Sequence, residues 1–148
     1  MVEFEELEEL LIDTDKEIDL YITKGIKNYM NKNKNSNMIV TVYVKLHDMD
    51  ERIGYISLRF GDAKKYIFAN IGYEIDEMYR GNNYTLKALN LLKDFMIENG
   101  MNKPVVIISK DNIPSNKVIQ RFGGYLISNF NDGFENINTY EVDLDKTR

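Results

Sequence analysis

The sequence predicts an α/β fold of the α+β kind, with a mixed, mostly antiparallel, twisted sheet and helices on both faces. Two observations support this class. Three β-rich segments follow one another through short polar turns, and an amphipathic helical segment then leads into a short apolar strand and a second helix. The 148 residues suffice for one core but not comfortably for two, so we expect residues 1–148 to form a single domain.

The amino-acid composition excludes several kinds of partner and of chemical site. The chain has 24 acidic against 19 basic side chains, which argues against nucleic acid as the principal partner. It has no cysteine, which excludes disulfides, thiolate metal sites and a cysteine nucleophile. The N-terminus is acidic where a secretory signal would be basic, and no apolar run approaches the roughly 18 residues of a membrane span. We expect a soluble, cytoplasmic protein with no membrane partner.

The first 37 residues predict two helices followed by a loop. Apolar side chains recur at helical spacing in two runs, Phe4, Leu7, Leu10 and Leu11, then Ile18, Tyr21, Ile22, Ile26 and Tyr29. The segment NKNKNSN, residues 31–37, is polar and has no periodicity, which is typical of an exposed connection.

Three strands are expected next, at residues 38–46, 53–60 and 66–75, and the short turns between them imply an antiparallel meander. A helix is then expected over residues 84–99, ending at Gly100. Its apolar face would consist of Thr85, Ala88, Leu89, Leu92, Phe95 and Met96.

The apolar run at residues 104–109 predicts a central strand covered on both faces. The crossover helix before it suggests parallel pairing with the preceding strand. A short helix over residues 115–122 and a final antiparallel pair of strands complete the predicted order.

The loop that enters the long helix contains Arg80, Gly81, Asn82 and Asn83, and it admits two interpretations. Asparagine and glycine are the usual residues of a plain strand-to-helix connection. The same residues can also turn consecutive N–H groups toward an anion at the helix N-terminus, with Arg80 adding a positive charge. The P-loop and dinucleotide fingerprints are both missing, so we expect any phosphate here to bind without magnesium chemistry.

A second polar cluster follows the apolar strand. Asn112 and Ser115 stand at another helix start, with Pro114 where a first turn tolerates it. Adjacent parallel strands that each end in a polar loop and a helix open a crevice at their carboxyl ends, the usual ligand position in open α/β sheets. The two clusters together predict a ligand site between two strand ends.

The runs IGYEIDEMYRGNNYTLKAL and DNIPSNKVIQRFGG resemble the GNAT superfamily of acyl-CoA-dependent N-acetyltransferases, and most closely its RimJ/RimL-like and related members. The first run is similar to the family's pyrophosphate motif, which is Arg or Gln, two residues, Gly, one residue, then Gly or Ala. The second is similar to its Asn-x-x-Ser helix ending in glycine. The resemblance covers the chain from about residue 38 onward. It implies a single GNAT-like domain with a V-shaped cleft between the two central parallel strands.

The resemblance also implies a reaction. Acetyl-CoA would be the co-substrate, with no metal, and a primary amine of a small molecule or a peptide would attack the thioester directly. Residues 1–37 would form the acceptor-side wall, and the protein would be a monomer or a homodimer. The coenzyme-binding residues carried over from the motifs are Ile75 (through its backbone N–H), Arg80, Gly81, Asn82, Asn83, Tyr84, Thr85, Asn112 and Ser115.

The sequence departs from the family motifs at three positions. Asn83 and Thr85 replace small residues of the pyrophosphate motif, which implies weaker coenzyme binding. Ile119 stands where many members place a tyrosine that protonates the leaving thiolate, so that role does not transfer. A second function therefore stays open, that of a GNAT-fold module that binds CoA or a partner without turnover.

Two residues of the third strand are candidates for catalysis. Alternation places Tyr73 with Ile75 on one face of the strand and Glu74 on the other. Tyr73 is either a proton-transfer or substrate-positioning group, or an ordinary core or rim tyrosine. Glu74 is the only carboxylate of the strand, and it is either a base or a solvated acid at a strand end. His47, the only histidine, stands at a turn and is assigned no role.

Overall fold

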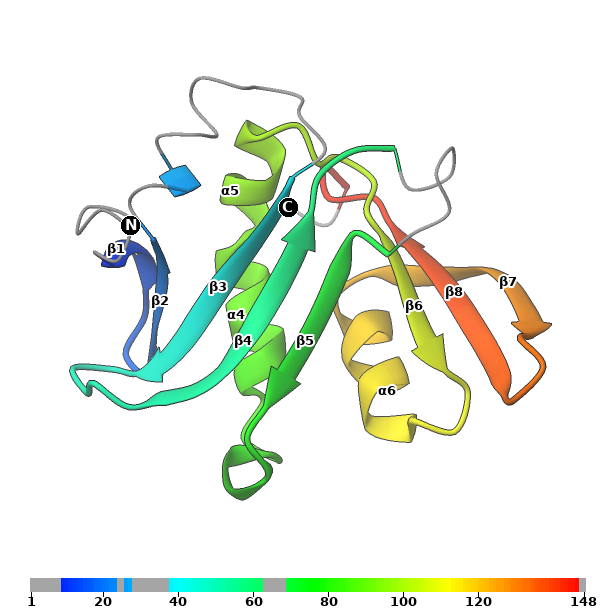
Figure 1. Cartoon of the computed structure of the whole chain (residues 1–148), viewed down its shortest axis with the longest axis horizontal. Coiled ribbons are helices and arrows are strands. Elements are labelled where there is room, and N and C mark those ends of the chain that lie inside the picture. The colour runs from blue at the N-terminus through cyan, green and yellow to red at the C-terminus, as the bar shows by residue number, and fades with distance from the viewer. Residues whose placement is uncertain (1–8, 24–25, 28–37, 63–68, 147–148) are drawn as a thin grey trace, which may run out of the picture.

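The computed structural model describes residues 9–23, 26–27, 38–62 and 69–146 (Figure 1). Within them, a five-stranded sheet has the order β1-β2-β3-β4-β5 and a three-stranded sheet has the order β6-β8-β7, and every ladder is antiparallel. The predicted α+β fold with mostly antiparallel strands is therefore confirmed. The elements are β1 (Glu9–Thr14), β2 (Ile18–Thr23), β3 (Ile39–Leu46), β4 (Arg52–Arg59), β5 (Ile71–Ile75), η1 (Glu77–Tyr79), α4 (Tyr84–Leu91), α5 (Lys93–Glu98), β6 (Val105–Ser109), α6 (Ile113–Arg121), β7 (Gly124–Asn131) and β8 (Asn136–Val142).

Residues 9–14 and 18–23 of the N-terminal segment form strands, so the helices predicted over these two stretches are wrong. β1 and β2 pair as an antiparallel hairpin. Ile18, Leu20 and Ile22 are fully buried. The spacing of Ile18 and Ile22 fits both a helix and a strand, but burial of Leu20 between them fits only the two-residue period of a strand. Ile26 and Lys27 are helical, and the predicted positions at 1–8 and 28–37, including the polar loop, lie outside the described residues.

β3, β4 and β5 form the predicted antiparallel meander. β5 begins at Ile71 and is shorter than the predicted strand, of which residues 66–68 lie outside the described part. Val40, Val42 and Val44 of β3 are fully buried and belong to one core cluster with the helices behind the sheet. The meander therefore supplies the rigid support for the end of β5.

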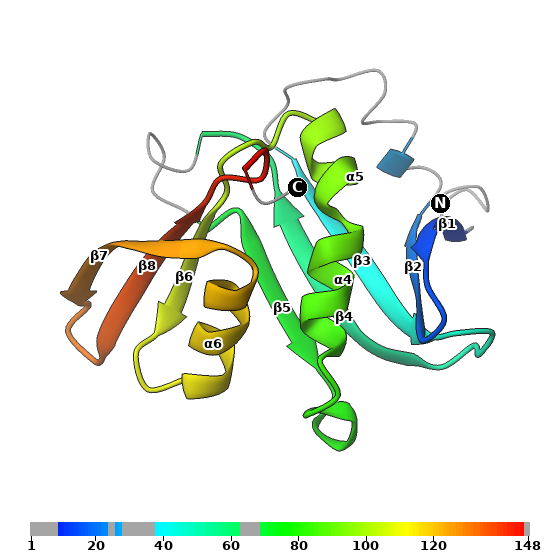
Figure 2. The same cartoon turned by 180° about the vertical axis from the view of Figure 1, so that it is seen from behind.

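The predicted long helix is present as α4 and α5, which follow one another along one face of the five-stranded sheet (Figure 2). They meet at Leu92, whose N–H donates to the carbonyl of Ala88 at 3.0 Å and to that of Leu89 at 3.2 Å. The predicted apolar face is buried at every position except the half-buried Thr85. Gly100 follows with φ of 93°, a left-handed conformation that glycine adopts without strain.

β5 and β6 run in the same direction, but they share no ladder and belong to separate sheets (Figure 1). Asn70 joins their starts, because its N–H donates to the Val105 carbonyl and its Oδ1 accepts from the Val105 N–H, both at 2.8 Å. From this vertex the strands diverge, as the predicted V requires. The predicted parallel pairing in one mixed sheet is wrong, since a buried asparagine side chain takes the place of the ladder.

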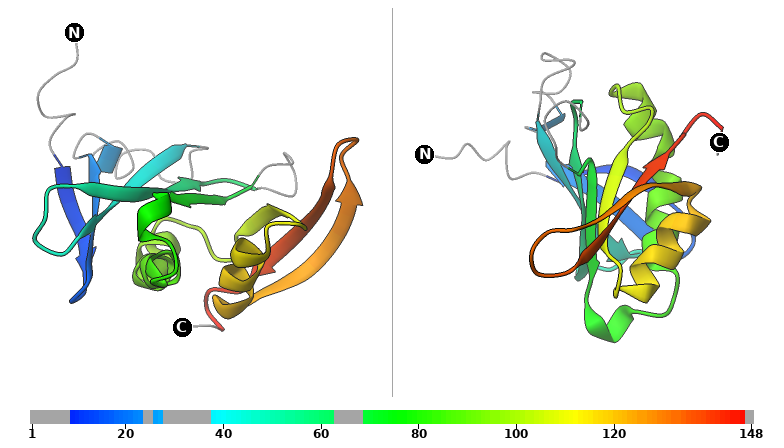
Figure 3. Two further views of the ribbon diagram at one scale, coloured as in Figure 1. Left: turned by 90° about the horizontal axis from the view of Figure 1, so that it is seen from below. Right: turned by 90° about the vertical axis from the view of Figure 1, so that its right-hand side faces the viewer.

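The helices α4, α5 and α6 all lie on the same side of the sheets (Figures 2 and 3). The described part of the N-terminal segment adds two strands to the five-stranded sheet. β6 was expected to be covered on both faces, but Ile107 is 40% exposed. No described helix has both the length and the apolar character needed to cross a membrane.

Candidate functional site

β5 presents two chemically different faces where the strands diverge. Ile71 and Ile75 are buried and Tyr73 is half-buried on the face that meets the helices. Gly72 and Glu74 are exposed on the opposite face. The predicted alternation is confirmed, and it separates the two catalytic candidates, Tyr73 and Glu74.

The backbone of Ile75 points away from β4. Ile75 pairs with Gly54, and next to this pair the Asp76 N–H donates to the Ile53 carbonyl at 2.7 Å. In an antiparallel ladder, a residue in such a position directs its own N–H and carbonyl to the other side of the strand. For Ile75 that side faces the diverging β6, with which β5 forms no ladder.

Gly54 explains how closely β4 approaches this strand end. A β-carbon at position 54 would lie 2.3 Å from the Glu74 carbonyl oxygen and 2.6 Å from Cδ1 of Ile75. A larger residue would therefore displace Ile75, so Gly54 fixes the position of the backbone that faces the V.

The loop into α4 holds two residues in the left-handed region. Gly81 has φ of 88° and Asn83 has φ of 60°. Nothing lies within 4 Å of a β-carbon built on Gly81, so the loop is open at this point. Asparagine tolerates a positive φ better than most residues, so Asn83 can hold this conformation.

The first turn of α4 is not capped by a side chain. Asn83 is the N-cap residue, but it makes no side-chain capping bond. The Lys87 N–H donates to the Asn83 carbonyl at 3.0 Å, and the N–H groups of Tyr84, Thr85 and Leu86 precede this bond, so they have no partner within the helix. With the helix dipole, these donors favour an anion at this position.

Arg80 folds back on the end of β5. Its Nε donates to the Ile75 carbonyl at 2.9 Å, and its Nη2 lies 4.0 Å from Oε1 of Glu74. The side chain is still 58% exposed. The guanidinium is thus tethered beside the loop while most of its surface faces solvent. The neighbouring Asn82 donates through Nδ2 to the Tyr79 carbonyl at 3.2 Å.

The N-terminus of α6 is satisfied by its own residues. Asn112 Oδ1 accepts from the Ser115 N–H at 3.3 Å, and Pro114 lies in the first turn, as predicted. Ser115 also reaches across to β5, because its Oγ lies 2.6 Å from the Tyr73 hydroxyl oxygen. The structure therefore brings Tyr73 and Ser115 together, whereas Glu74 lies on the other face of β5 with 62% of its side chain exposed.

The protonation state of the Tyr73 hydroxyl follows from its burial. Burial raises the pKa of the Tyr73 hydroxyl, so the group keeps its proton at neutral pH. It can donate a hydrogen bond or pass on a proton, but it is not a base under these conditions. Ile119, to which no proton transfer was assigned, is fully buried and serves the core.

Sequence reasoning missed two buried asparagines that hold the site together. Asn116 donates through Nδ2 to the Ser109 carbonyl at 3.0 Å, and its Oδ1 accepts from the Tyr140 hydroxyl at 2.7 Å. It thereby ties α6 to β6 and β8, while Asn70 ties β5 to β6. Asn70 stands within an apolar run, and that is the signal that could have identified it.

A polar cluster at β2 and the turn after β3 was also not predicted. His47 Nδ1 lies 2.8 Å from Oδ1 of the buried Asp19, and its Nε2 lies 3.2 Å from Oδ2 of Asp48. The hydrogen bond to Asp19 raises the pKa of His47. Burial opposes ionisation of Asp19, but hydrogen bonds from Thr14 and His47 hold its pKa below the usual value. Asp19, His47 and Asp48 could together offer ligands to a metal ion, but their polar atoms already bond one another and fix this turn.

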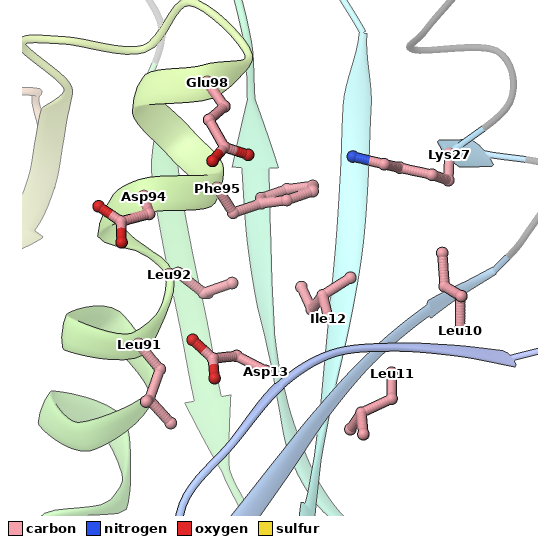
Figure 4. Close-up of a pocket in the computed structure, with 10 residues that line it drawn as sticks. All are labelled: Leu10, Leu11, Ile12, Asp13, Lys27, Leu91, Leu92, Asp94, Phe95 and Glu98. Carbon is pink, nitrogen blue, oxygen red and sulfur yellow. The ribbon is translucent and has the colours of Figure 1, made fainter.

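A pocket of about 280 Å³ lies on the far side of α4 and α5 from the V, against β1 (Figure 4). Its walls are mainly leucine, isoleucine and phenylalanine, and its charged lining residues are Asp13, Lys27, Asp94 and Glu98. Lys27 Nζ lies 5.1 Å from the centre of the Phe95 ring. None of the predicted coenzyme-binding or catalytic residues lines this pocket. Half of its lining comes from the segment 1–37, which was predicted to form the acceptor-side wall, namely Leu10, Leu11, Ile12, Asp13 and Lys27.

Comparison with protein families finds a match over most of the chain. The family described as the acetyltransferase (GNAT) domain matches residues 5–124. No curated protein matches the chain.

Solved structures show the same fold at low sequence identity. RimL, a ribosomal L7/L12 alpha-N-protein acetyltransferase in complex with coenzyme A, superposes with a TM-score of 0.70 and 18% identity, covering 92% of this chain and 100% of that one. An acetyltransferase from Salmonella typhimurium that modifies the N-terminal serine of L7/L12 gives 0.66 and 17%, covering 89% and 98%. The microcin C7 self-immunity acetyltransferase MccE, in complex with acetyl-CoA and AMP, gives 0.58 and 21%, covering 80% and 68%.

Proposed function

The chain belongs to the acetyltransferase (GNAT) family, and from this premise we propose that it transfers an acetyl group from acetyl-CoA to a primary amine of a peptide or a small molecule. Membership makes it an N-acetyltransferase. The observation that carries the proposal is the uncapped N-terminus of α4, which leaves backbone donors available at the open end of the V.

The coenzyme diphosphate is assigned to the loop and first turn of α4. The N–H groups of Tyr84 and Thr85 have no intrahelical partner, and the positive φ values of Gly81 and Asn83 turn the preceding N–H groups toward the same region. Arg80 would exchange the Ile75 carbonyl for a phosphate oxygen. Asn82 and the Thr85 hydroxyl are further polar groups beside this position.

The pantetheine and the thioester are assigned to the space between β5 and β6. The Ile75 N–H is directed there and has no strand partner on that side. A fixed donor of this kind stabilises the oxyanion that forms when the amine attacks the thioester carbonyl. Asn112 and Ser115 of α6 would flank the coenzyme from the other side of the V.

The reaction is proposed as a direct transfer. The amine nitrogen bonds to the thioester carbon, the carbon–sulfur bond breaks, the CoA thiolate gains a proton and the nitrogen loses one. Tyr73 is the proposed donor to the thiolate, because its hydroxyl is protonated and lies 2.6 Å from Ser115 Oγ, which would orient it and pass on a replacement proton.

The attacking amine must be neutral. For an alkyl amine with a pKa of about 10.4, deprotonation at pH 7 costs about 4 to 5 kcal/mol. Glu74 is the proposed acceptor of that proton, because it is an exposed carboxylate on the opposite face of β5 from Tyr73. The two protons would then be handled on different faces of one strand.

The acceptor side is assigned to the N-terminal segment of the single domain. Residues 1–37 are proposed as its wall, and residues 1–8, 24–25 and 28–37 of this segment lie outside the described residues. RimL and the Salmonella protein, which share this fold, act on the N-terminus of a ribosomal protein. A peptide N-terminus is therefore the first acceptor to test, ahead of small alkyl amines.

A second candidate function is a CoA-binding module without turnover. Two features favour it. Asn83 and Thr85 replace small residues of the pyrophosphate motif, and the buried Ile119 stands where a tyrosine is common in the family. In that case the coenzyme would bind but no acetyl group would be transferred.

Thermal unfolding with acetyl-CoA, CoA and ATP tests binding. A ligand at one hundred times its dissociation constant stabilises the fold by roughly 2.7 kcal/mol, so both CoA compounds should raise the melting temperature and ATP should not. Release of the CoA thiol, followed with a chromogenic thiol reagent, then tests turnover, and the protein adds no background because it has no cysteine. The absence of any shift at millimolar acetyl-CoA would contradict the proposed site. A shift without thiol release from any peptide or alkyl amine would favour the binding module.

A further inference from the structure

β7 is an edge strand that lacks the charged residues and prolines that usually prevent an edge strand from pairing with another chain. It is the outer strand of the sheet ordered β6-β8-β7, and seven of its eight residues are exposed. Its sequence, GYLISNFN, contains no charged residue and no proline, although 29% of the chain is charged. Soluble proteins usually place lysine, proline or inward-pointing charges on such an edge, because its free backbone groups attract another strand.

The exposed side chains of β7 form an apolar surface. Tyr125, Leu126, Ile127 and Phe130 are between 42% and 49% exposed, and Phe134 in the turn to β8 is 96% exposed. A bulge between residues 126 and 128 leaves Ile127 without a partner in β8.

The bulge also places the rings of Tyr125 and Phe130 on the same face of the sheet. Tyr125 pairs with Glu141 and Phe130 pairs with Ile137, which are four residues apart on β8, so both rings stand on the same face of the sheet. A hydrogen bond from the Tyr125 hydroxyl to Glu141 holds one of these rings in place. The edge therefore carries an aromatic side chain near each of its ends.

The opposite edge of the molecule is built differently. β1 is the outer strand of the five-stranded sheet, and it carries the carboxylates Glu9 and Asp13. Glu9 forms ion pairs with Lys45 and Arg52. Charges thus protect β1 against pairing with another chain, and β7 has none.

We propose that β7 pairs with β7 of a second copy of this chain, antiparallel across a two-fold axis, so that two three-stranded sheets become one of six strands. A strand that pairs with its own two-fold copy is necessarily antiparallel, which is the arrangement that β7 already has with β8. Tyr125 of one copy would then lie near Phe130 of the other, once on each side of the axis.

Charge favours this edge over other surfaces. The chain has a net charge of -5, so two copies repel each other at most contacts, whereas the strand between residues 124 and 131 brings no like charges together. The inference is independent of the proposed acetyl transfer, since β7 carries none of the proposed site residues.

Sedimentation equilibrium of the full chain tests the proposal. The wild type should sediment at twice the 17.3 kDa of one chain, and the double variant Ile127→Lys, Phe130→Lys should sediment as a monomer. Both side chains are exposed and Ile127 has no strand partner, so the variant should keep its fold, which its circular dichroism and melting temperature would verify. Leu11→Lys in β1 is the matched control, because Leu11 is 47% exposed and should leave the dimer intact.

Three results would overturn the proposal. They are a wild type that stays monomeric up to high micromolar concentration, a folded double variant that stays dimeric, and dissociation caused equally by Leu11→Lys. Amide hydrogen exchange gives a readout that needs no variant. Exchange in residues 124–131 should slow as the wild-type concentration rises, and unchanged exchange there across the monomer–dimer transition would place the contact elsewhere.

Discussion

The N-termini of α4 and α6 follow the neighbouring strands β5 and β6, and they differ in whether a side chain caps them. α6 is capped by the Asn112 side chain and has Pro114 in its first turn. α4 begins at Asn83 in a left-handed conformation, without a side-chain cap, after the open Gly81. A side-chain cap stabilises a protein by about 1 kcal/mol. A helix start without such a cap keeps its backbone N–H groups available, so it is the better candidate for binding an external anion.

The two helix starts are suited to different tasks. The α4 terminus offers backbone donors and is suited to holding a diphosphate. The α6 terminus keeps its donors occupied and instead presents the Ser115 hydroxyl to Tyr73, so it is suited to the transfer of a proton.

The largest effect is expected at the α6 side. Tyr73→Phe removes the hydroxyl that contacts Ser115, and loss of a positioned proton donor should lower kcat by about 100-fold. Acetyl-CoA affinity should stay the same, because the proposed diphosphate site is on α4. Steady-state kinetics and calorimetric titration measure the two quantities, and a Phe variant with wild-type kcat would remove Tyr73 from the mechanism.

The next effect is expected at the α4 side. Thr85→Asp places a carboxylate among the unpaired N–H groups, where it would occupy them and repel the diphosphate. The Kd for acetyl-CoA should rise at least about tenfold, or 1.4 kcal/mol, without loss of thermal stability. Asn90→Asp is the matched control, because it adds the same charge at an exposed position of the same helix beyond the first turn. Equal affinities for the two variants would refute the placement of the diphosphate.

A smaller change is expected from Arg80→Ala. The guanidinium must leave the Ile75 carbonyl before it can bind phosphate, so its net contribution should be only about 1 kcal/mol, a roughly fivefold rise in Kd. Because Arg80 is 58% exposed, the melting temperature should change little. Arg121→Ala at the other end of α6 serves as the control, and titration with CoA measures both. An unchanged Kd for Arg80→Ala would mean that the arginine only braces the loop.

The smallest effects concern stability and compare the caps directly. Asn112→Ala removes a side-chain cap and should lower the free energy of unfolding by about 1 kcal/mol. Asn83→Gly removes no cap and relieves a positive φ, so it should leave stability unchanged or raise it by a few tenths of a kcal/mol. Urea unfolding measures both, and a loss at Asn83→Gly as large as that at Asn112→Ala would show that α4 is capped after all.

The sequence predicted the parts of the fold whose pattern is local. The meander β3 to β5, the apolar face of α4 and α5, and the two helix starts all follow from periodicity and from Asn, Gly and Pro at turns. The N-terminal helices were wrong because Ile18 and Ile22 fit two periods, and only the packing of Leu20 between them decides for a strand.

The rest depends on contacts between distant residues. Asn70 replaces a ladder between β5 and β6 through bonds to Val105, and no local pattern shows that partner. Asn116 likewise joins three elements by hydrogen bonds. Alternation placed Tyr73 on the correct face of β5, but its contact with Ser115 depends on how α6 is docked.

A crystal structure of the protein with CoA would show whether the N-terminus of α4 holds the coenzyme diphosphate. We expect the diphosphate on the backbone N–H groups of residues 81–85, with the Arg80 guanidinium moved from the Ile75 carbonyl to a phosphate oxygen. A diphosphate at the capped start of α6, or in the pocket beside β1, would contradict it.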